Sequence, residues 1–152
     1  MELAVSCKNV SKVYDTGGQK VTALNCIDLD IVIGELMMLV GPSGCGKTTL
    51  ISVVAGILDQ DNGSCELFGE NLQDMSSKDK LNFRARNIGF VFQSFNLLPS
   101  LNAAENVSIP LILNGMKRFE AERKAVTVLE EVGLGDRWKF LPSQLSGGQQ
   151  QR

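Results

Sequence analysis

The sequence predicts an α/β fold, because separate segments show the patterns of a buried strand, a half-buried strand and an amphipathic helix. The apolar residues 36–40 precede a glycine-rich loop at 41–49, and the apolar segment 50–56 follows it, which indicates a strand, a loop and a helix. Residues 21–33 alternate apolar and polar side chains over much of their length, as a strand with one wet face does. Residues 117–132 place their apolar side chains mostly on one stripe, which is typical of a helix that packs on a core.

The composition is that of one globular domain. The chain has 152 residues, 43% hydrophobic and 21% charged, enough for a single core that buries roughly 70% of the unfolded surface. A net charge of −2 provides no bulk attraction for nucleic acid or anionic lipid. No run approaches the roughly 18 to 20 apolar residues that span a bilayer, and Met1 begins no secretory signal, so we expect a cytosolic protein.

The four cysteines do not indicate a metal site. Cys7, Cys26, Cys45 and Cys65 form no CxxC pair, and the chain has no histidine, which argues against zinc. We expect four reduced thiols, the usual state of cysteine in the cytosol.

The first half of the chain is expected to hold most of the strands. Residues 3–14 indicate a strand running into a loop, and a turn with two glycines separates them from the strand at 21–33. The helix after the glycine-rich loop is expected to span about 46–58. Residues 64–68 alternate as a short strand.

A short helix and a second buried strand are expected next. The helix runs to about Arg84 with Ser76 or Ser77 as its N-cap, and the strand spans 87–92. Gln93 follows that strand directly and has two interpretations. It is either a polar residue that closes the strand or a carboxamide that points into the crevice where α/β sheets bind ligands.

From residue 94 onward the chain is expected to be mainly helical. Residues 103–113 have a helical pattern interrupted by Pro110, and the amphipathic helix at 117–132 follows. The apolar loop at 95–101 is a candidate interface.

The glycine-rich loop has the pattern of a phosphate-binding loop. Gly41, Gly46, Lys47 and Thr48 match G-x-x-x-x-G-K-[ST] between a strand and a helix. The glycines let backbone N–H groups turn toward a phosphate at a helix N-terminus. Lys47 can then reach the β- and γ-phosphates and Thr48 can ligate Mg²⁺, whereas a simple turn needs neither residue.

Two further features are open to more than one interpretation. Tyr14 is either a half-buried strand residue or an aromatic platform that stacks on adenine. Ser146 is a good N-cap, and Gly147 and Gly148 leave the backbone at the start of a helix uncovered by side chains. This segment is therefore either a second anion site or a linker.

Together these residues resemble the ATP-binding cassette (ABC) ATPase domains over the whole chain. Tyr14, the loop GPSGCGKTT at 41–49, Gln93 and LSGGQQQR at 145–152 occur in the order and at about the spacing of that family. The phrase FVFQSFNLLPSLNAAENVSIPL at 90–111, with VTALNCIDLDIVIGE near the start, looks most like the subfamily of lipoprotein-releasing, macrolide-export and glycolipid-export systems.

The resemblance implies an α/β fold of the P-loop NTPase type. It has an N-terminal antiparallel β part, a partial parallel core sheet and a helical subdomain. The chain would be one incomplete ABC ATPase domain, with the β-subdomain and P-loop core at about 1–93 and the helical subdomain at about 94–152.

The resemblance also implies a nucleotide site that holds ATP and Mg²⁺. Tyr14 would stack on adenine, Lys47 would contact the β- and γ-phosphates, and Thr48 and Gln93 would contact Mg²⁺. Gln93 would also contact the attacking water and relay to the membrane partner. The triphosphate-binding residues would be Gly41, Ser43, Gly44, Cys45, Gly46, Lys47, Thr48 and Thr49.

The signature implies two protein partners. Ser146, Gly147, Gly148 and Gln149 would contact the ATP of a second ATPase subunit in a head-to-tail dimer. A separate membrane-spanning permease would hold the protein at the inner face of the cell membrane.

The family continues past the signature with an apolar strand ending in Asp-Glu, whose Glu is the general base, and with a histidine that senses the γ-phosphate. No apolar run in this sequence ends in Asp-Glu. We therefore expect an incomplete domain whose residues support ATP binding better than ATP hydrolysis, because the general base is missing. The missing strands would leave residues 36–40 with unpaired backbone and an exposed apolar face.

The leading hypothesis is therefore the ATPase subunit of an ABC transporter. Two alternatives remain, a soluble ABC-type ATPase that acts in translation or DNA repair, and a nucleotide-binding fragment without turnover.

Overall fold

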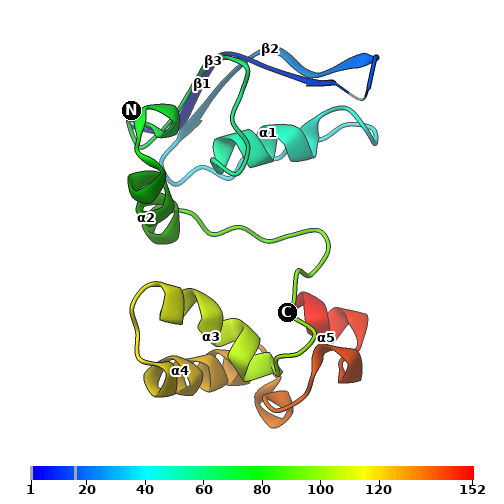
Figure 1. Cartoon of the computed structure of the whole chain (residues 1–152), viewed down its shortest axis with the longest axis vertical. Coiled ribbons are helices and arrows are strands. Elements are labelled where there is room, and N and C mark those ends of the chain that lie inside the picture. The colour runs from blue at the N-terminus through cyan, green and yellow to red at the C-terminus, as the bar shows by residue number, and fades with distance from the viewer. Residues whose placement is uncertain (1, 16) are drawn as a thin grey trace. The chain divides into compact units, whose positions relative to one another are not determined.

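The computed structural model describes residues 2–15 and 17–152 and consists of two compact units. The first unit ends at Ile88 and the second begins at Gly89 (Figure 1). Each unit has its own hydrophobic core. Within the described residues no helix is long and apolar enough to cross a membrane.

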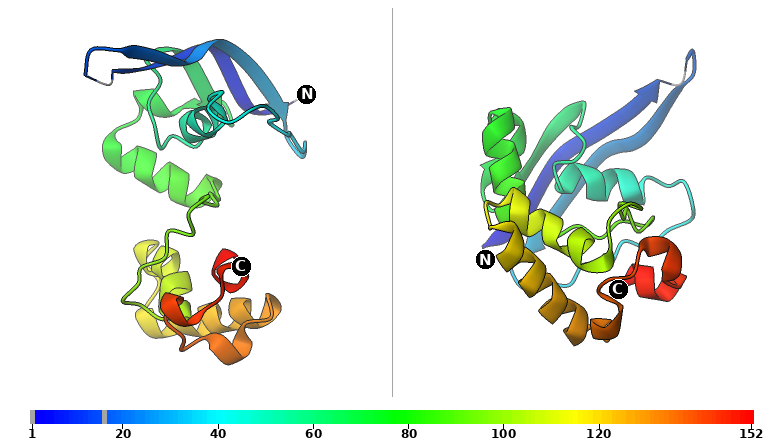
Figure 2. Two further views of the ribbon diagram at one scale, coloured as in Figure 1. Left: turned by 90° about the vertical axis from the view of Figure 1, so that its right-hand side faces the viewer. Right: turned by 60° about the horizontal axis from the view of Figure 1, so that its bottom comes forward.

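The first unit is built on a four-stranded sheet. Its strands are β1 (Leu3–Asp15), β2 (Lys20–Val32), β3 (Asn62–Leu67) and β4 (Glu70–Asn71), in the order β2-β1-β3-β4. Every pair is antiparallel, and β1 pairs with β2 on one side and with the shorter β3 on the other. The two long strands β1 and β2 extend as a hairpin, seen in blue in Figure 2.

Helix α1 (Lys47–Val54) packs its buried residues against this sheet. A 3₁₀ turn, η1 (Leu72–Asp74), and helix α2 (Ser77–Asn87) complete the unit. The core of the first unit consists of Val5, Cys7, Val10, Leu24, Leu50, Val53, Cys65, Leu67 and Leu72.

The second unit is helical. It contains α3 (Ala103–Leu113), α4 (Arg118–Glu131), the 3₁₀ turns η2 (Gly135–Arg137) and η3 (Pro142–Gln144), and α5 (Gly147–Gln151). Its core consists of Ala103, Ala104, Ala125, Leu129, Leu134 and Leu145.

Side-chain caps explain where two of these helices begin. Ser76, rather than Ser77, caps α2, because its hydroxyl accepts the Asp79 N–H at 3.2 Å. Asn102 caps α3 by accepting the Glu105 N–H at 2.9 Å. Pro110 lies inside α3 without ending it, so the expected interruption of that helix is not found.

The structure corrects the expectation of parallel strands. Residues 36–40 and 87–92 form no regular strand, and the sheet of the described residues contains no parallel pair. Leu36 and Val40 are 89% and 87% exposed and Val91 is 83% exposed, so neither segment is buried. The physical reason is that no strand pairs with their backbone in the described chain, as the resemblance implied for 36–40.

The expectation of a single core is also corrected. The buried apolar residues form one cluster in each unit. Composition counts the apolar side chains, but only their contacts decide how many cores they make.

Candidate functional site

The glycine-rich loop has a left-handed backbone at the two positions where its sequence needs one. Gly44 has a φ of 81° and Gly46 a φ of 90°, values that L-residues with a Cβ atom rarely adopt. Gly46 is the N-cap of α1, so the chain passes directly from this turn into the helix. A Cβ atom at Gly46 would lie 2.3 Å from the carbonyl oxygen of Ala23, so the loop also packs tightly on β2.

Lys47 folds back across its own loop. Its Nζ donates hydrogen bonds to the carbonyl oxygens of Gly41 at 2.8 Å and Pro42 at 2.6 Å, and it lies 3.4 Å from the Cys45 Sγ. The side chain therefore already reaches along the loop with its charge in contact with backbone oxygens. An anion in the loop would exchange these neutral acceptors for a charged one, which makes a stronger hydrogen bond.

The N-terminus of α1 suits a phosphate. No side chain of the described residues caps it, and its first turn holds no acidic residue, so its N–H groups and positive dipole end have no protein anion beside them. Thr48 and Thr49 lie in this first turn, and Thr48 is exposed. A threonine hydroxyl is an oxygen ligand of the kind that Mg²⁺ takes, so these residues fit a magnesium-bound triphosphate.

The other expected nucleotide contacts are divided between the two units. Tyr14 lies near the end of β1, opposite Val21, in the same unit as the loop, and is 40% exposed. Gln93 lies in the second unit, in an exposed segment without regular structure. Both interpretations of Tyr14 and of Gln93 stay predictions.

The LSGGQ segment begins a helix through a reciprocal cap. Ser146 caps α5 by accepting the Gln149 N–H at 3.3 Å, and the Gln149 Oε1 accepts the Ser146 N–H at 2.8 Å. The Gln150 amide donates to the carbonyl oxygens of Pro142 at 2.9 Å and Leu145 at 3.0 Å. The Gln149 side chain thus orders the segment, and Gln150 attaches it to the preceding turn.

The two signature glycines are not required by the packing of the described residues. A Cβ atom at Gly147 or Gly148 would meet nothing within 4 Å, and neither residue has a positive φ. Their bare backbone is therefore open to another molecule.

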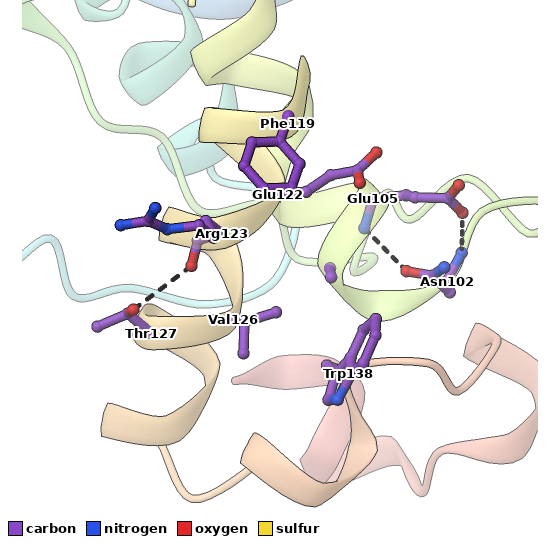
Figure 3. A pocket seen from close by; sticks show the side chains of 9 residues that line it. Asn102, Glu105, Phe119, Glu122, Arg123, Val126, Thr127 and Trp138 are labelled. Carbon is purple, nitrogen blue, oxygen red and sulfur yellow. Dashed lines mark hydrogen bonds between the residues drawn. The ribbon is translucent and has the colours of Figure 1, made fainter. Parts of the chain in front are cut away.

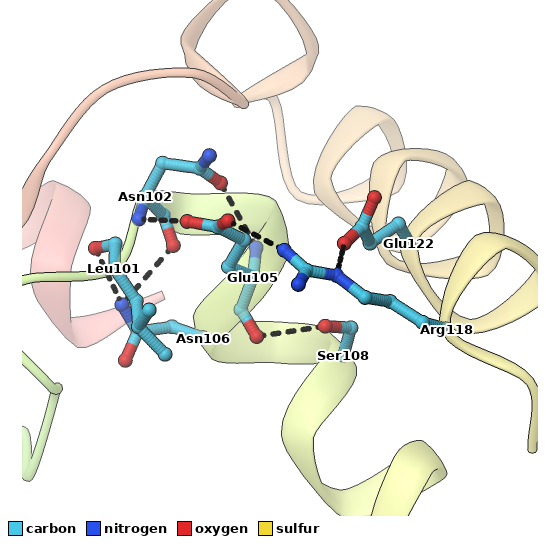
Figure 4. Close-up of polar contacts among 7 residues, drawn as sticks. All are labelled: Leu101, Asn102, Glu105, Asn106, Ser108, Arg118 and Glu122. Atoms are coloured by element: carbon cyan, nitrogen blue, oxygen red, sulfur yellow. Dashed lines mark hydrogen bonds and ion pairs between the residues drawn. The ribbon is translucent and has the colours of Figure 1, made fainter.

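A polar network lies at the start of α3 (Figure 4). Asn102 and Glu105 form a capping box, and the second oxygen of Glu105 accepts from Arg118 at 3.0 Å. Arg118 also donates to Glu122 at 2.6 Å, so it joins α3 to α4. This box was missed by the sequence reasoning, although the spacing N-x-x-E that precedes it was a usable signal.

The second unit also has a pocket between α3 and α4 (Figure 3). Phe119 and Val126 line it from α4, and Trp138 lines it from beyond η2. None of the expected site residues lines this pocket, so it is separate from the phosphate-binding loop.

Comparisons with known proteins agree on one family. The family model described as "ABC transporter" matches residues 24–152. The uncharacterized ABC transporter ATP-binding protein YknY of Bacillus subtilis is 44% identical over 149 residues, which is 97% of this chain and 64% of the relative. An uncharacterized ABC transporter ATP-binding protein of Thermotoga maritima is 45% identical over 153 residues, covering 100% of this chain and 65% of that protein.

A solved structure shares the fold. The ATP-binding cassette MJ0796, solved as a dimer in a post-hydrolysis state bound to ADP and Pi, matches with a TM-score of 0.88 and 36% identity. The match covers 96% of this chain and 65% of that one. The chain thus spans slightly less than two thirds of the length of these three proteins.

Proposed function

The chain belongs to the ABC transporter family of ATP-binding domains, and we propose that it is part of the subunit that binds and hydrolyses ATP to power such a transporter. The observation that carries the proposal is the phosphate-binding loop. Its positive-φ glycines, its uncapped helix N-terminus and the nearby ammonium of Lys47 are three anion-binding features in nine residues.

In this proposal Lys47 leaves the carbonyl oxygens of Gly41 and Pro42 and contacts the β- and γ-phosphates. The backbone N–H groups at residues 44–48 hold the remaining phosphate oxygens, and Thr48 ligates Mg²⁺. When bound, Mg²⁺ supplies a positive charge that neutralises the phosphate oxygens as the bond to the γ-phosphate breaks. Ser43 and Cys45, which stand between the glycines, and Thr49, which follows Thr48, belong to the same loop and are proposed to contact the triphosphate as well.

Two residues outside the loop complete the proposed nucleotide contacts. Tyr14 stacks on the adenine, a role supported by the 40% exposure of this residue. Gln93 contacts Mg²⁺ and the attacking water, a role for which its exposed position beyond residues 87–92 leaves the carboxamide accessible.

The proposed assembly is a head-to-tail dimer with ATP between the two subunits. Ser146, Gly147, Gly148 and Gln149 contact the ATP of the partner subunit. Support comes from the open space around both glycines and from the dimeric state of MJ0796. Binding of ATP then holds the subunits together, and its hydrolysis weakens that contact.

The proposed partner in the membrane is a separate permease that holds this subunit at the inner face of the cell membrane. The proposed substrate is a lipoprotein, a lipid or an amphipathic molecule, which the transporter exports or extracts. The apolar loop at 95–101 supports a docking role, since Phe95 and Leu98 are 40% and 49% exposed. The layout of a β-subdomain with the P-loop core at 1–93 and a helical subdomain at 94–152 belongs to the same proposal.

Calorimetry of Mg-ATP binding tests the nucleotide site. We expect saturable binding to the purified chain, lost in Lys47→Ala and kept in Lys80→Ala, which removes the same charge from α2. Far-UV circular dichroism of all three proteins shows whether they are folded. Equal binding by Lys47→Ala and the unchanged chain would refute the proposed site.

Recovery with membranes tests the transporter role. The subunit should co-purify with membranes that contain its permease, and Phe95→Ser with Leu98→Ser should abolish this while leaving Mg-ATP binding intact. Full function in a membrane-free system would favour an ABC-type ATPase without a transport role.

A further inference from the structure

Two buried cysteines face each other across the sheet of the first unit. Cys7 on β1 and Cys65 on β3 are direct partners in the antiparallel register. Their sulfur atoms are 2.8 Å apart, and the two residues are 0% and 4% exposed. The other two cysteines, Cys26 and Cys45, are exposed, and among the described residues neither contacts a second thiol.

The backbone already meets the requirements of a disulfide. Directly opposed residues in antiparallel strands have Cα atoms about 4.5 to 5.5 Å apart, which lies in the range of about 4.4 to 6.8 Å that disulfides span. The sulfur atoms of Cys7 and Cys65 would need to approach by only about 0.8 Å to reach the covalent distance of about 2.05 Å. The bond therefore needs a small rotation of two side chains and no shift of register.

The contact between the thiols also shifts their pKa values in opposite directions. The hydrogen bond with Cys65 lowers the pKa of Cys7, because it stabilises the thiolate of that residue. The same hydrogen bond, together with burial, raises the pKa of Cys65. Either sulfur atom can donate this hydrogen bond, and the one that accepts it has the more stable thiolate and reacts first.

We propose that Cys7 and Cys65 form a modification site, a reversible cross-strand disulfide made by hydrogen peroxide and broken by thiols. The thiolate of one cysteine of the pair attacks one peroxide oxygen, the O–O bond breaks, and the released hydroxide takes a proton to become water. The thiol of the other cysteine then loses its proton and attacks the sulfur of the sulfenic acid, the S–O bond breaks, and a second water leaves. One peroxide is reduced, and two thiols are oxidised.

The position of β3 allows peroxide to reach the pair. Among the described residues, the sheet partner on the far side of β3 is the two-residue strand β4, so most of β3 pairs its backbone with β1 alone. Local opening of this side of the sheet uncovers both sulfur atoms at once. Peroxide is a small oxidant and needs only a brief opening.

The disulfide would link the two ends of a segment that contains the phosphate-binding loop. The linked residues are 58 positions apart, and both pack in the same cluster as Leu50 and Val53 of α1. Closing so long a loop removes conformational freedom from the unfolded chain. We therefore expect oxidation to raise the thermal transition of the chain by about 10 °C or more and to leave the register of the sheet unchanged.

Peroxide treatment followed by peptide mapping tests the proposal. The purified chain is treated with a small excess of hydrogen peroxide, alkylated in denaturant and digested without reductant. We expect one dominant cross-linked peptide pair, containing Cys7 and Cys65, with the loss of two hydrogens and with reversal by dithiothreitol. The same treatment in guanidinium chloride is the control, and it should give a mixture of pairings.

Matched variants separate this site from the exposed thiols. Cys26→Ser with Cys45→Ser should keep both the cross-link and the thermal shift, while Cys65→Val should lose both. The proposal is overturned if native protein leaves Cys7 and Cys65 alkylated as free thiols, or if the native and denatured samples give the same mixture. A cross-link without any rise in the transition would overturn the expected stabilisation.

Discussion

The backbone of Gly46 lies so close to β2 that a Cβ atom at this position would be 2.3 Å from the Ala23 carbonyl oxygen. Side chains cannot approach a carbonyl oxygen so closely, and the oxygen belongs to backbone that is held in the sheet. Gly46 is thus required both by its φ of 90° and by the strand on which it packs. The loop and the sheet are joined at this residue.

Gly46→Ala should therefore destabilise the first unit by more than Gly44→Ala. Both changes introduce a Cβ atom at a positive φ, which costs about 1 to 2 kcal/mol, but only the change at Gly46 adds a collision with the backbone. Chemical denaturation of the two variants measures the difference in free energy of unfolding. Equal losses of stability would show that Ala23 does not constrain the loop.

Gly147→Ala and Gly148→Ala should leave folding intact. A Cβ atom at either position meets no atom within 4 Å, so the free energy of unfolding should change by less than about 0.5 kcal/mol or rise slightly. If the proposed dimer is right, the same variants weaken the ATP-dependent association of two subunits, which sedimentation velocity measures. Loss of stability together with association would point to an internal role for these glycines.

Asn102→Ala should destabilise the second unit by about 1 kcal/mol, because it removes the side-chain acceptor of the capping box on α3. Lys117→Ala is the matched control, since Lys117 is the N-cap of α4 but makes no side-chain cap. Its effect on the free energy of unfolding should stay within about 0.5 kcal/mol. Thermal denaturation of both variants measures the difference, and a similar cost for both would argue against the capping box.

Asp61 should make part of the stability depend on pH. Hydrogen bonds from Lys12 Nζ at 2.6 Å and from the Val13 N–H at 2.7 Å lower the pKa of Asp61 from its ordinary value of 3.8. The folded state thus favours the carboxylate of Asp61. The contribution of this carboxylate to the free energy of unfolding is therefore present above about pH 4 and is lost as the pH falls through the lowered pKa.

Asp61→Asn removes this contribution. The variant should have a lower free energy of unfolding than the unchanged chain at pH 7. The difference between the two free energies should become smaller as the pH falls toward 2.5. Denaturant titrations across that range measure it, with Asp74→Asn as the control, because Asp74 makes no ion pair among the described residues. A gap that is constant with pH would exclude the ion pair as its cause.

Features that depend on neighbouring residues were largely predictable. The positive φ at Gly44 and Gly46, the cap by Ser146 and the amphipathic helix at 117–132 each follow from residues within about one or two turns. Strand β2 was also predicted, because alternation reports one buried face. Strand β1 was predicted only in part, since it continues to Asp15 where a loop was expected. The capping box of Asn102 was overlooked although it is equally local.

The sequence by itself determined the family, the phosphate-binding loop and the type of most elements, because glycines, caps and hydrophobic periodicity act over short distances along the chain. Only the tertiary structure decided that residues 36–40 and 87–92 form no strand, since a strand needs a partner for its backbone hydrogen bonds. It alone placed Gly46 on Ala23 and Cys7 beside Cys65. Gly46 and Ala23 are 23 positions apart in the sequence, and Cys7 and Cys65 are 58 positions apart. The cysteine pair is set by the register of β1 and β3, and a local sequence pattern does not specify register across such a separation.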